Sequence, residues 1–505
     1  MNALHRSFVV TPSVVRLCTT SLLFALFLAG CASRAERHAF DDWIRRDRAD
    51  YDGQHQPEWS TPAALDADGK AKVAADPLGE DAQLNDYLRY AALHNPGLEA
   101  AFNEWKAALE RIPQARTLPD PRFNYRYFIE NVETRVGPQR QAFGLSQTFP
   151  WFGKLELAGE VALESARAAQ AQYAARKLRL FYEVKRAHSE YSYLGRALAV
   201  VQENLNLMGY LEGVARTRFK AAAGQHPDVI RAQVELGKLD DQLRSLKDLR
   251  GALAARLNAS MNRPIETPIP WPKTIPEAVG KMDSDALVKS LRLTNPELQA
   301  LQHEIAMRRA GISLAGKNYY PEITVGVDYI DTGESRSAMR PADSGQDAVA
   351  AGFSITLPIW REKYDAGVRE SMARFGAATK MRVDRQNMLA AELKTAIYHY
   401  EDAVRKIDLF RDTLVPKAQQ SLKATEASFR AGQSTFIDLM DAERVLLQFQ
   451  LSYERALTDG AARLAEIETL VGRDVEPIVK PPDSEQPQPE NQTPDKPEKG
   501  DPDAQ

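Results

Sequence analysis

The sequence is poor in cysteine, which limits both cross-linking and thiol chemistry. Its 505 residues include two cysteines, Cys18 and Cys31, and Cys18 falls within an expected leader peptide. A single remaining thiol cannot form an internal disulfide. The eight histidines are scattered and lack the His-Cys or His-x-x-x-His spacing of a zinc site. Because no nucleophile stands beside a base either, the sequence predicts no cofactor, no metal site and no enzyme.

Long hydrophobic runs and a charge excess are also missing. After residue 30 no apolar run reaches the length of about 18 residues that a transmembrane helix needs. The 65 basic residues nearly balance the 69 acidic ones, a formal net charge of -4, which gives no reason to expect a nucleic-acid partner. Hydrophobic residues make up 44% of the chain, as in a folded protein, whereas the Pro-rich acidic stretch 474–505 is predicted to be a disordered tail.

The first 30 residues have the layout of a lipoprotein signal peptide. Arg6 and Arg16 precede a short apolar run that ends in the letters LAGC, of which the last is Cys31. Basic, apolar and small-residue regions in this order indicate a secretory signal, and LAGC resembles the bacterial lipobox. We expect Cys31 to carry a covalent lipid such as palmitate; the alternative is an ordinary signal with a chance cysteine. In Gram-negative lipoproteins an aspartate after the lipidated cysteine favours retention in the inner membrane, so by this resemblance Ala32 implies the outer membrane.

Four segments have the alternation of β-strands. Apolar and aromatic residues recur at every second position, and prolines stand at the segment ends, where a missing N–H costs no ladder hydrogen bond. Strands of roughly 9–11 residues can cross a bilayer, but a membrane barrel needs about eight or more strands, so several chains would have to pool theirs. The segments form two pairs, 123–130 with 141–149 and 323–330 with 348–357, joined by expected loops at 131–140 and 331–347.

The chain contains an internal repeat. The seven residues from His94 match those from Thr294, an offset of 200, and the seven from Gly144 match those from Gly352, an offset of 208. Because the offset drifts so little, the pattern indicates a duplication. The expected organisation is an N-terminal segment at 31–83, a first repeat at 84–261, a linker at 262–283 and a second repeat at 284–473.

Each repeat is predicted to hold a helix, a strand pair, a much longer helix and a returning helix. The first helices are expected at 84–117 and 284–317, and the long ones at 154–220 and 363–430, where glycine and proline are sparse. At ~1.5 Å per residue each long helix would span roughly 100 Å, which favours a coiled-coil shaft. In the returning helix of the first repeat, leucines from Leu239 to Leu257 recur every three or four residues, which places them along one face of the helix.

Together these features resemble the TolC-type outer-membrane efflux proteins, over nearly everything from Asn85 to Arg473. The resemblance rests on the duplicated plan, on Asn-Pro-x-Leu motifs at Asn95 and Asn295, on FSITLP at 353–358, and on AGQSTFIDLMDA at 431–442. It implies a mainly α fold with a small β part, in which three chains form a β-barrel of about 12 strands continued by an α-barrel. The implied function is a passive exit duct in outer-membrane lipid, docked to a periplasmic adaptor and an inner-membrane pump, with the cargo left open.

The resemblance also implies a gate. In the family, paired aspartates just past the second turn line the constricted periplasmic mouth, and Asp438 and Asp441 match those positions. Three chains would gather a ring of carboxylates that attracts cations; the alternative is a pair of solvated aspartates at a helix start, where the dipole favours acids. In the first repeat Asp228 and Arg231 take the corresponding places, so they are a weaker gate candidate or a latch between helices.

Two tip turns complete the expected site. Gly224 and Gly432 would meet the adaptor, although a tight turn favours glycine in any case. Two other classes of protein stay open from the residues alone. A periplasmic adaptor would have one hairpin between β-rich halves and no duplicated strand pairs, and a structural coiled-coil lipoprotein would leave the aromatic strands without a role.

Overall fold

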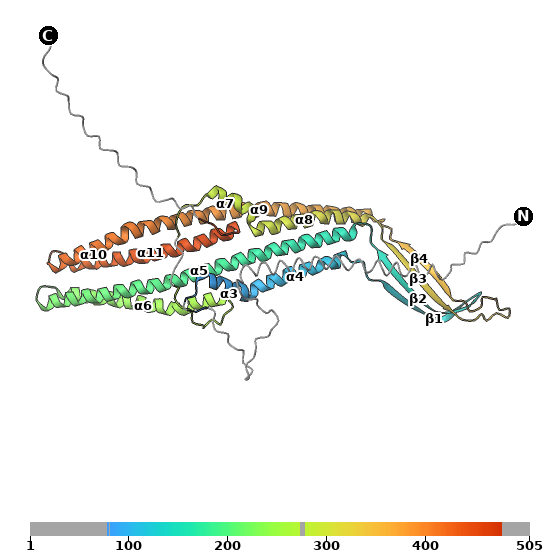
Figure 1. Ribbon diagram of the computed structural model, residues 1–505, viewed down its shortest axis with the longest axis horizontal. Helices are drawn as coiled ribbons and strands as arrows, with labels where there is room; N and C mark the ends of the chain where they lie inside the picture. The colour runs from blue at the N-terminus through green and yellow to red at the C-terminus, as the bar shows by residue number, and fades with distance from the viewer. Residues whose placement is uncertain (1–77, 80, 273–277, 477–505) are drawn as a thin grey trace, which may run out of the picture.

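The computed structural model describes residues 78–79, 81–272 and 278–476. These residues form a rod with a sheet at one end and helical hairpins at the other (Figure 1). The expected signal peptide, Cys31 and nearly all of the predicted C-terminal tail lie outside the described residues. Among the helices of the described part, none combines the length and apolarity needed to cross a membrane.

The two repeats have the same order of elements. The first consists of α3 (Leu84–His94), α4 (Pro96–Arg116), β1 (Arg122–Thr134), β2 (Gly137–Phe149), α5 (Lys154–Lys220) and α6 (His226–Ser260). The second consists of α7 (Ser284–Thr294), α8 (Pro296–Gly316), the short 3-10 helix η1 (Lys317–Tyr319), β3 (Ile323–Thr332), β4 (Ala348–Ile355), α9 (Arg361–Leu409), the π-helical η2 (Phe410–Leu414), α10 (Val415–Arg430) and α11 (Phe436–Val471).

The first helix of each repeat is broken at the Asn-Pro motif, so the predictions of single helices at 84–117 and 284–317 were wrong. Proline disfavours the helical conformation in the residue before it and is common in the first turn of a new helix. Asn95 accordingly has extended backbone angles, and its side-chain Oδ1 accepts a hydrogen bond from the Leu98 backbone N–H at 2.9 Å. The motif ends one helix and caps the next.

The same asparagine ties the new helix to the end of the returning one. Asn95 Nδ2 donates to the Ser260 carbonyl oxygen at 3.0 Å, at the end of α6. In the second repeat Asn295 Oδ1 accepts from the Leu298 N–H at 3.0 Å, and its Nδ2 donates to the Leu470 carbonyl at 2.8 Å. The repeated motif is therefore a structural joint that closes each half of the rod.

The long helix of the second repeat is also interrupted, in contrast to the continuous helix predicted for 363–430. Five residues, 410–414, form a π-helical turn just before Pro416. Proline has no N–H to donate to the carbonyl four residues earlier, and its ring clashes with that carbonyl. A π turn accommodates the mismatch without ending the shaft.

Ion pairs between α5 and α11 hold the two repeats together along the rod. Helix α5 belongs to the first repeat and α11 to the second, so each pair crosses between them. The pairs are Lys185 with Glu468 at 2.6 Å, Arg455 with Glu190 at 3.0 Å, and Arg196 with Glu454 at 3.4 Å. Towards the tip the two hairpins share one apolar core, to which α5, α6, α10 and α11 all contribute.

The four strands form one antiparallel sheet in the order β1-β2-β3-β4. Strands β1 and β2 extend further than predicted and meet at a two-residue turn, 135–136, so most of the expected loop at 131–140 is strand. Gly137 follows the turn with φ 137°, a conformation open to glycine. Strand β4 ends at Ile355, two residues before the predicted end.

One face of the sheet is aromatic and apolar. Tyr125 and Phe143 lie opposite each other with ring centroids 5.2 Å apart, and Tyr329 continues the row on β3. Phe123 is 67% exposed and Ile129 is 93% exposed, because no described helix covers this face (Figure 1). The opposite face carries small and polar residues, including Asn124, Gly144, Asp328 and Ala350, paired across the strands. The sheet has two chemically different sides.

The asparagine joint gives a stability prediction. Asn295→Ala should lower the free energy of unfolding by about 1–3 kcal/mol, because it removes a helix cap and leaves the Leu470 carbonyl without its donor. Thermal unfolding followed by circular dichroism measures the change. Asn206→Ala is the matched control, since Asn206 is an exposed helical asparagine that contacts only Gln202 of the same helix. Equal effects at the two positions would contradict the joint.

Candidate functional site

The two tip turns lie side by side at the end of the rod remote from the sheet (Figure 1). Gly432 has φ 77°, as expected for a glycine that ends a helix. In the first turn Ala222 takes the left-handed conformation instead, with φ 56°. Gly224 is needed there for a different reason: a side-chain carbon at this position would lie 3.0 Å from Arg218 Cβ and 3.1 Å from the Phe219 nitrogen. Both glycines shape the tip, by two mechanisms.

An arginine that sequence reasoning missed joins the two turns. Arg218, near the end of α5, donates to the Phe429 carbonyl oxygen at the end of α10. Its guanidinium also stacks over the Phe429 ring, 4.6 Å from the centroid, and donates to the Ala223 carbonyl at 3.2 Å. Phe429 in turn packs against Phe436, at the start of α11. The tip is thus a cross-linked unit and not two independent loops.

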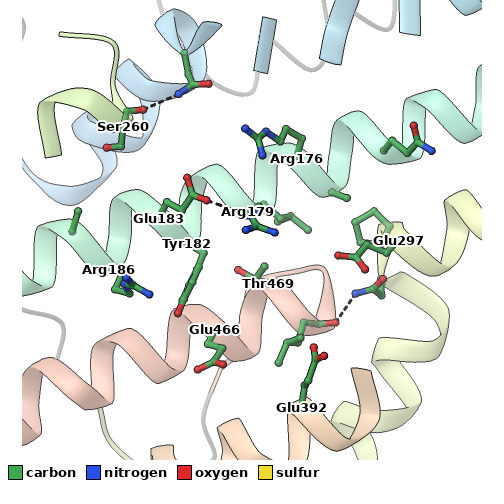
Figure 2. Close-up of a pocket in the computed structure, with 18 of the residues that line it drawn as sticks. Arg176, Arg179, Tyr182, Glu183, Arg186, Ser260, Glu297, Glu392, Glu466 and Thr469 are labelled. Carbon is green, nitrogen blue, oxygen red and sulfur yellow. Dashed lines mark hydrogen bonds and ion pairs between the residues drawn. The ribbon is translucent and has the colours of Figure 1, made fainter. Parts of the chain in front are cut away.

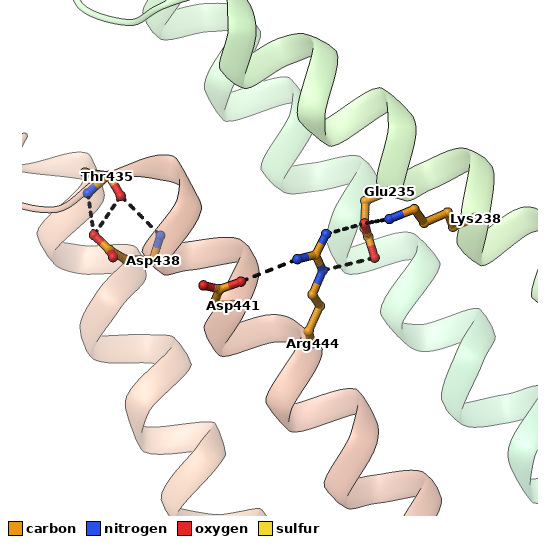
Figure 3. Close-up of polar contacts among 6 residues, drawn as sticks. All are labelled: Glu235, Lys238, Thr435, Asp438, Asp441 and Arg444. Carbon is orange, nitrogen blue, oxygen red and sulfur yellow. Dashed lines mark hydrogen bonds and ion pairs between the residues drawn. The ribbon is translucent and has the colours of Figure 1, made fainter.

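Asp438 is engaged with its own helix. Its Oδ2 accepts hydrogen bonds from the Thr435 backbone N–H at 2.9 Å and from the Thr435 hydroxyl at 2.7 Å, and Thr435 Oγ1 accepts from the Asp438 N–H (Figure 3). This reciprocal arrangement is a capping box. The hydrogen bonds from Thr435 lower the pKa of Asp438, so the carboxylate is ionised at neutral pH. Its geometry matches the helix-start alternative, whereas its gate role stays a prediction.

Asp441 lies one turn further along α11 and is open to solvent. Its side chain is 63% exposed, and Arg444 approaches it at 3.4 Å. Arg444 also reaches across to the other hairpin, where its guanidinium donates to the two Glu235 oxygens at 2.7 and 3.3 Å (Figure 3). Lys238 adds a pair to Glu235 at 3.2 Å. These hydrogen bonds, Arg444 foremost, lower the pKa of Glu235.

Asp228 and Arg231 form a pair within α6, with the guanidinium 3.3 Å from the carboxylate. Arg231 therefore contacts a carboxylate of its own helix, and its possible roles in a gate or a latch stay predictions; within this chain it is Arg444 that joins neighbouring helices. Arg231 pairs with Asp228 because residues three apart on a helix are neighbours. Arg444 reaches Glu235 because it lies where α11 faces α6.

Glu443 is a buried carboxyl in the core of the tip. It is 0% exposed, and neither carboxylate oxygen has a hydrogen-bond partner in the described residues. Leu439, Met440 and Leu446, one turn before and after it on α11, belong to the apolar core shared by the two hairpins. Burial, together with the nearby charge of Glu235, raises the pKa of Glu443 to about 7, and Arg444 opposes the shift. A glutamate in the apolar seam of α11 was the sequence feature that could have revealed it.

The raised pKa predicts how pH acts on the tip. Below the ordinary pKa of 4.5 Glu443 is protonated whether packed or unfolded, so it adds no pH dependence. Between that value and about 7 only the unfolded state ionises, so stability falls as pH rises, and above about 7 the full cost persists. Glu443→Gln should therefore reduce the amount by which the thermal unfolding midpoint falls between pH 4.5 and pH 8. If the midpoint of the variant falls by as much as that of the unchanged chain, the prediction is wrong.

No metal centre accompanies these carboxylates: in residues 78–79, 81–272 and 278–476 no group of three or more His, Cys, Asp or Glu side chains could hold an ion. The site is instead a set of polar ties over an apolar core. These groups lie where the two hairpins contact each other: the Arg444–Glu235 ion pair joins α11 to α6, and Glu443 is buried in the apolar core that the hairpins share. Asp441 adds exposed negative charge at the same level.

Comparisons with known proteins give a consistent result. The family profile described as outer membrane efflux protein matches residues 287–473. The chain is 24% identical over 423 residues to the cobalt-zinc-cadmium resistance protein CzcC of Cupriavidus metallidurans, covering 80% of this chain and 92% of the relative. It is 21% identical over 321 residues to the outer membrane protein TolC of Vibrio cholerae, covering 62% and 72%.

Solved structures share the fold. The outer membrane protein VceC of Vibrio cholerae superposes with a TM-score of 0.64 at 18% identity, covering 78% of this chain and 97% of that one. The outer membrane channel MtrE of Neisseria gonorrhoeae, in its open state, gives 0.63 at 20% identity, covering 83% and 97%. The likeness therefore extends from the sheet to the helical tip.

Proposed function

This chain belongs to the TolC-type family of outer-membrane efflux proteins, and we propose that three copies of it form the exit duct of a tripartite pump. The protein is an outer-membrane channel with a periplasmic extension, and it is not an enzyme. The sheet would form the part in the membrane, the helices would form the periplasmic tunnel, and the tip would control the opening.

The observation that carries the proposal is the unsupported sheet. No element of the described part of the chain covers its aromatic face, and within that part strands β1 and β4 leave an open edge on each side. Three sheets joined edge to edge give about 12 strands, enough to close a barrel with no free edge. The apolar face would then meet lipid, and the face with Asn124 and Asp328 would line water. This is the two-sided pattern that a membrane barrel requires.

The tip supports a gate that opens by separating hairpins. Arg444 on α11 and Glu235 on α6 belong to different hairpins of one chain, so the α11 hairpin can swing away only if their contact breaks. In a trimer three such ties would act around one axis. Asp441, exposed beside the tie, would place carboxylates at the mouth, where they attract cations.

The partners are proposed from the position of the tip, and the lipid anchor is proposed from the LAGC motif that ends at Cys31. The turns at Gly224 and Gly432 would be the first part of the duct to meet a periplasmic adaptor and its inner-membrane pump. Cys31 would carry the lipid, and the mass of the native N-terminal peptide tests this. One acyl chain alone binds membranes weakly, so the barrel would remain the main anchor.

The cargo is proposed to be chosen by the pump and not by the duct. Relatives of this chain have names that refer to metal resistance, as in CzcC, and to fusaric acid resistance, as in FusA of Burkholderia cepacia. A duct able to serve such different compounds needs no dedicated site. Swapping the pump while keeping this chain should therefore change which compounds are exported, and an unchanged export profile would contradict the proposal.

Charge placed on the apolar face tests the barrel. Val325→Lys should impair assembly, because a lysine facing lipid near the bilayer centre costs about 2–4 kcal/mol per chain. Native electrophoresis of membrane extracts measures the oligomer. Asn124→Lys is the control, since Asn124 lies on the polar face. Loss of assembly in both variants, or in neither, would contradict the assignment of faces.

Two substitutions test the gate separately from the barrel. Arg444→Gln removes hydrogen bonds worth about 1–3 kcal/mol, which should shift the closed–open balance by roughly 5–150-fold towards open and raise conductance in planar bilayers. Asp441→Asn should instead reduce the preference for cations, because it removes one negative charge per chain from the mouth.

Arg244→Gln is the control for the gate. Arg244 also pairs with a carboxylate, Asp240, but the pair is exposed and within one helix, and such pairs contribute little. It should leave conductance unchanged. If Arg444→Gln conducts no more than Arg244→Gln, the contact with Glu235 does not hold the gate.

A further inference from the structure

A pocket of about 880 Å³ lies in the middle of the rod. Residues of α5 from Gln172 to Ala187 form one wall, and the two asparagine joints contribute the others, with Asn95 and Ser260 from the first repeat and Asn295 and Leu470 from the second. Its volume falls in the range of small-molecule sites, roughly 300–1,000 Å³. It is separate from the tip, and nothing in the channel proposal uses it.

The carboxylates of this pocket all have cationic partners. Glu183 pairs with Arg179 at 3.3 Å. Glu297 and Glu392 share Arg385, at 2.8 and 3.2 Å. Glu466 pairs with Arg463 at 2.7 Å. The negative charge that lines the pocket is therefore already compensated by the chain.

The arginines are not compensated in the same way. Arg176, Arg186 and Arg256 line the pocket and have no carboxylate partner in the described part of the chain. Arg186 only stacks on Tyr182, 5.9 Å from the ring centroid. Arg176 and Arg186 lie on the same long helix beside the space, together with the paired Arg179 (Figure 2). The lining itself holds four arginines and four glutamates; each glutamate has an arginine partner, whereas three of the arginines pair with no carboxylate of the described residues.

We propose that this pocket binds an anion with two or more carboxylate or phosphate groups. Arginine is suited to this role because its planar fork of N–H donors matches both groups in a bidentate way and stays charged at every physiological pH. A cation would meet carboxylates that are already paired with arginines, beside three guanidinium groups that are not. A neutral apolar compound would have to cover guanidinium groups without replacing their hydrogen bonds to water, which is costly.

Two sources could supply such an anion. One is a free solute of the periplasm. The other is the chain itself, because α11 ends beside the pocket at Val471 and the sequence 477–505 contains seven acidic and three basic residues. Both sources offer anionic oxygens to the same arginines, carboxylate oxygens from the tail and carboxylate or phosphate oxygens from a solute.

Calorimetric titration of the purified full-length chain with citrate and with pyrophosphate, at fixed salt, tests the proposal. Saturable binding of either probe is expected, weakened about tenfold or more in the double variant Arg176→Gln/Arg256→Gln and unchanged in Arg244→Gln. A second chain, with the acidic residues of 477–505 replaced by their amides, separates the sources. Binding only in that chain means that the tail occupies the pocket, and binding in both means that a free solute does.

The proposal is overturned if neither chain binds either probe, or if the double variant binds as tightly as the unchanged chain. Circular dichroism confirms that the double variant keeps its helices. If it does not, Arg186→Gln alone decides the question, because this side chain is tied to the fold only by its stacking on Tyr182. Undiminished affinity in that variant would then exclude the site.

Discussion

A sheet of four strands with one uncovered apolar face is the constraint on which the rest of the structure depends. Such a sheet is not stable alone in water, since it can neither bury its aromatic row nor satisfy its two edges. The remedy available to a chain of this design is to share the sheet with other copies and to place the apolar face in lipid. Assembly with other copies and a membrane location would both meet that requirement, and the proposed number of three copies rests on the resemblance to the efflux family.

The helical part transmits this arrangement over a long distance. Helix α5 runs unbroken for 67 residues, so any symmetry imposed at the sheet is carried to the tip. The asparagine joints at Asn95 and Asn295 fix where shorter helices end against it. At the far end, the apolar core tends to hold the hairpins together, while the buried Glu443 opposes close packing when it is ionised. The tip is therefore a junction whose strength depends on a few polar groups within an apolar core.

Much of this was predictable from local pattern. Strand alternation located all four strands, and the scarcity of glycine and proline gave the bounds of α5 at Lys154 and Lys220 as observed. The differences between the predicted and the observed elements lie at prolines and at one glycine. Pro96 and Pro296 end the preceding helices, and Pro416 is preceded by a π turn. Gly137 closes a tight hairpin where a loop was expected.

The candidate site was harder to predict from the sequence, because the two contacts that join its hairpins, Arg444 with Glu235 and Arg218 with Phe429, link residues more than 200 positions apart. Nothing local to Arg444 indicates that Glu235 lies opposite, and nothing local to Arg218 indicates that it reaches Phe429. The capping role of Asp438 could have been read from Thr435 three positions earlier. Glu443 interrupts an apolar seam, and that interruption is the sequence feature that a search for a buried carboxyl should examine.

Native mass spectrometry of the full-length protein, released from detergent micelles, tests the central claim most directly. If four strands per chain close a shared barrel, the protein leaves the micelle as a trimer that survives dilution. A folded monomer that stays monomeric at every protein concentration, with its helical content intact, would contradict the account, because the sheet would then have satisfied its edges and its apolar face without other copies.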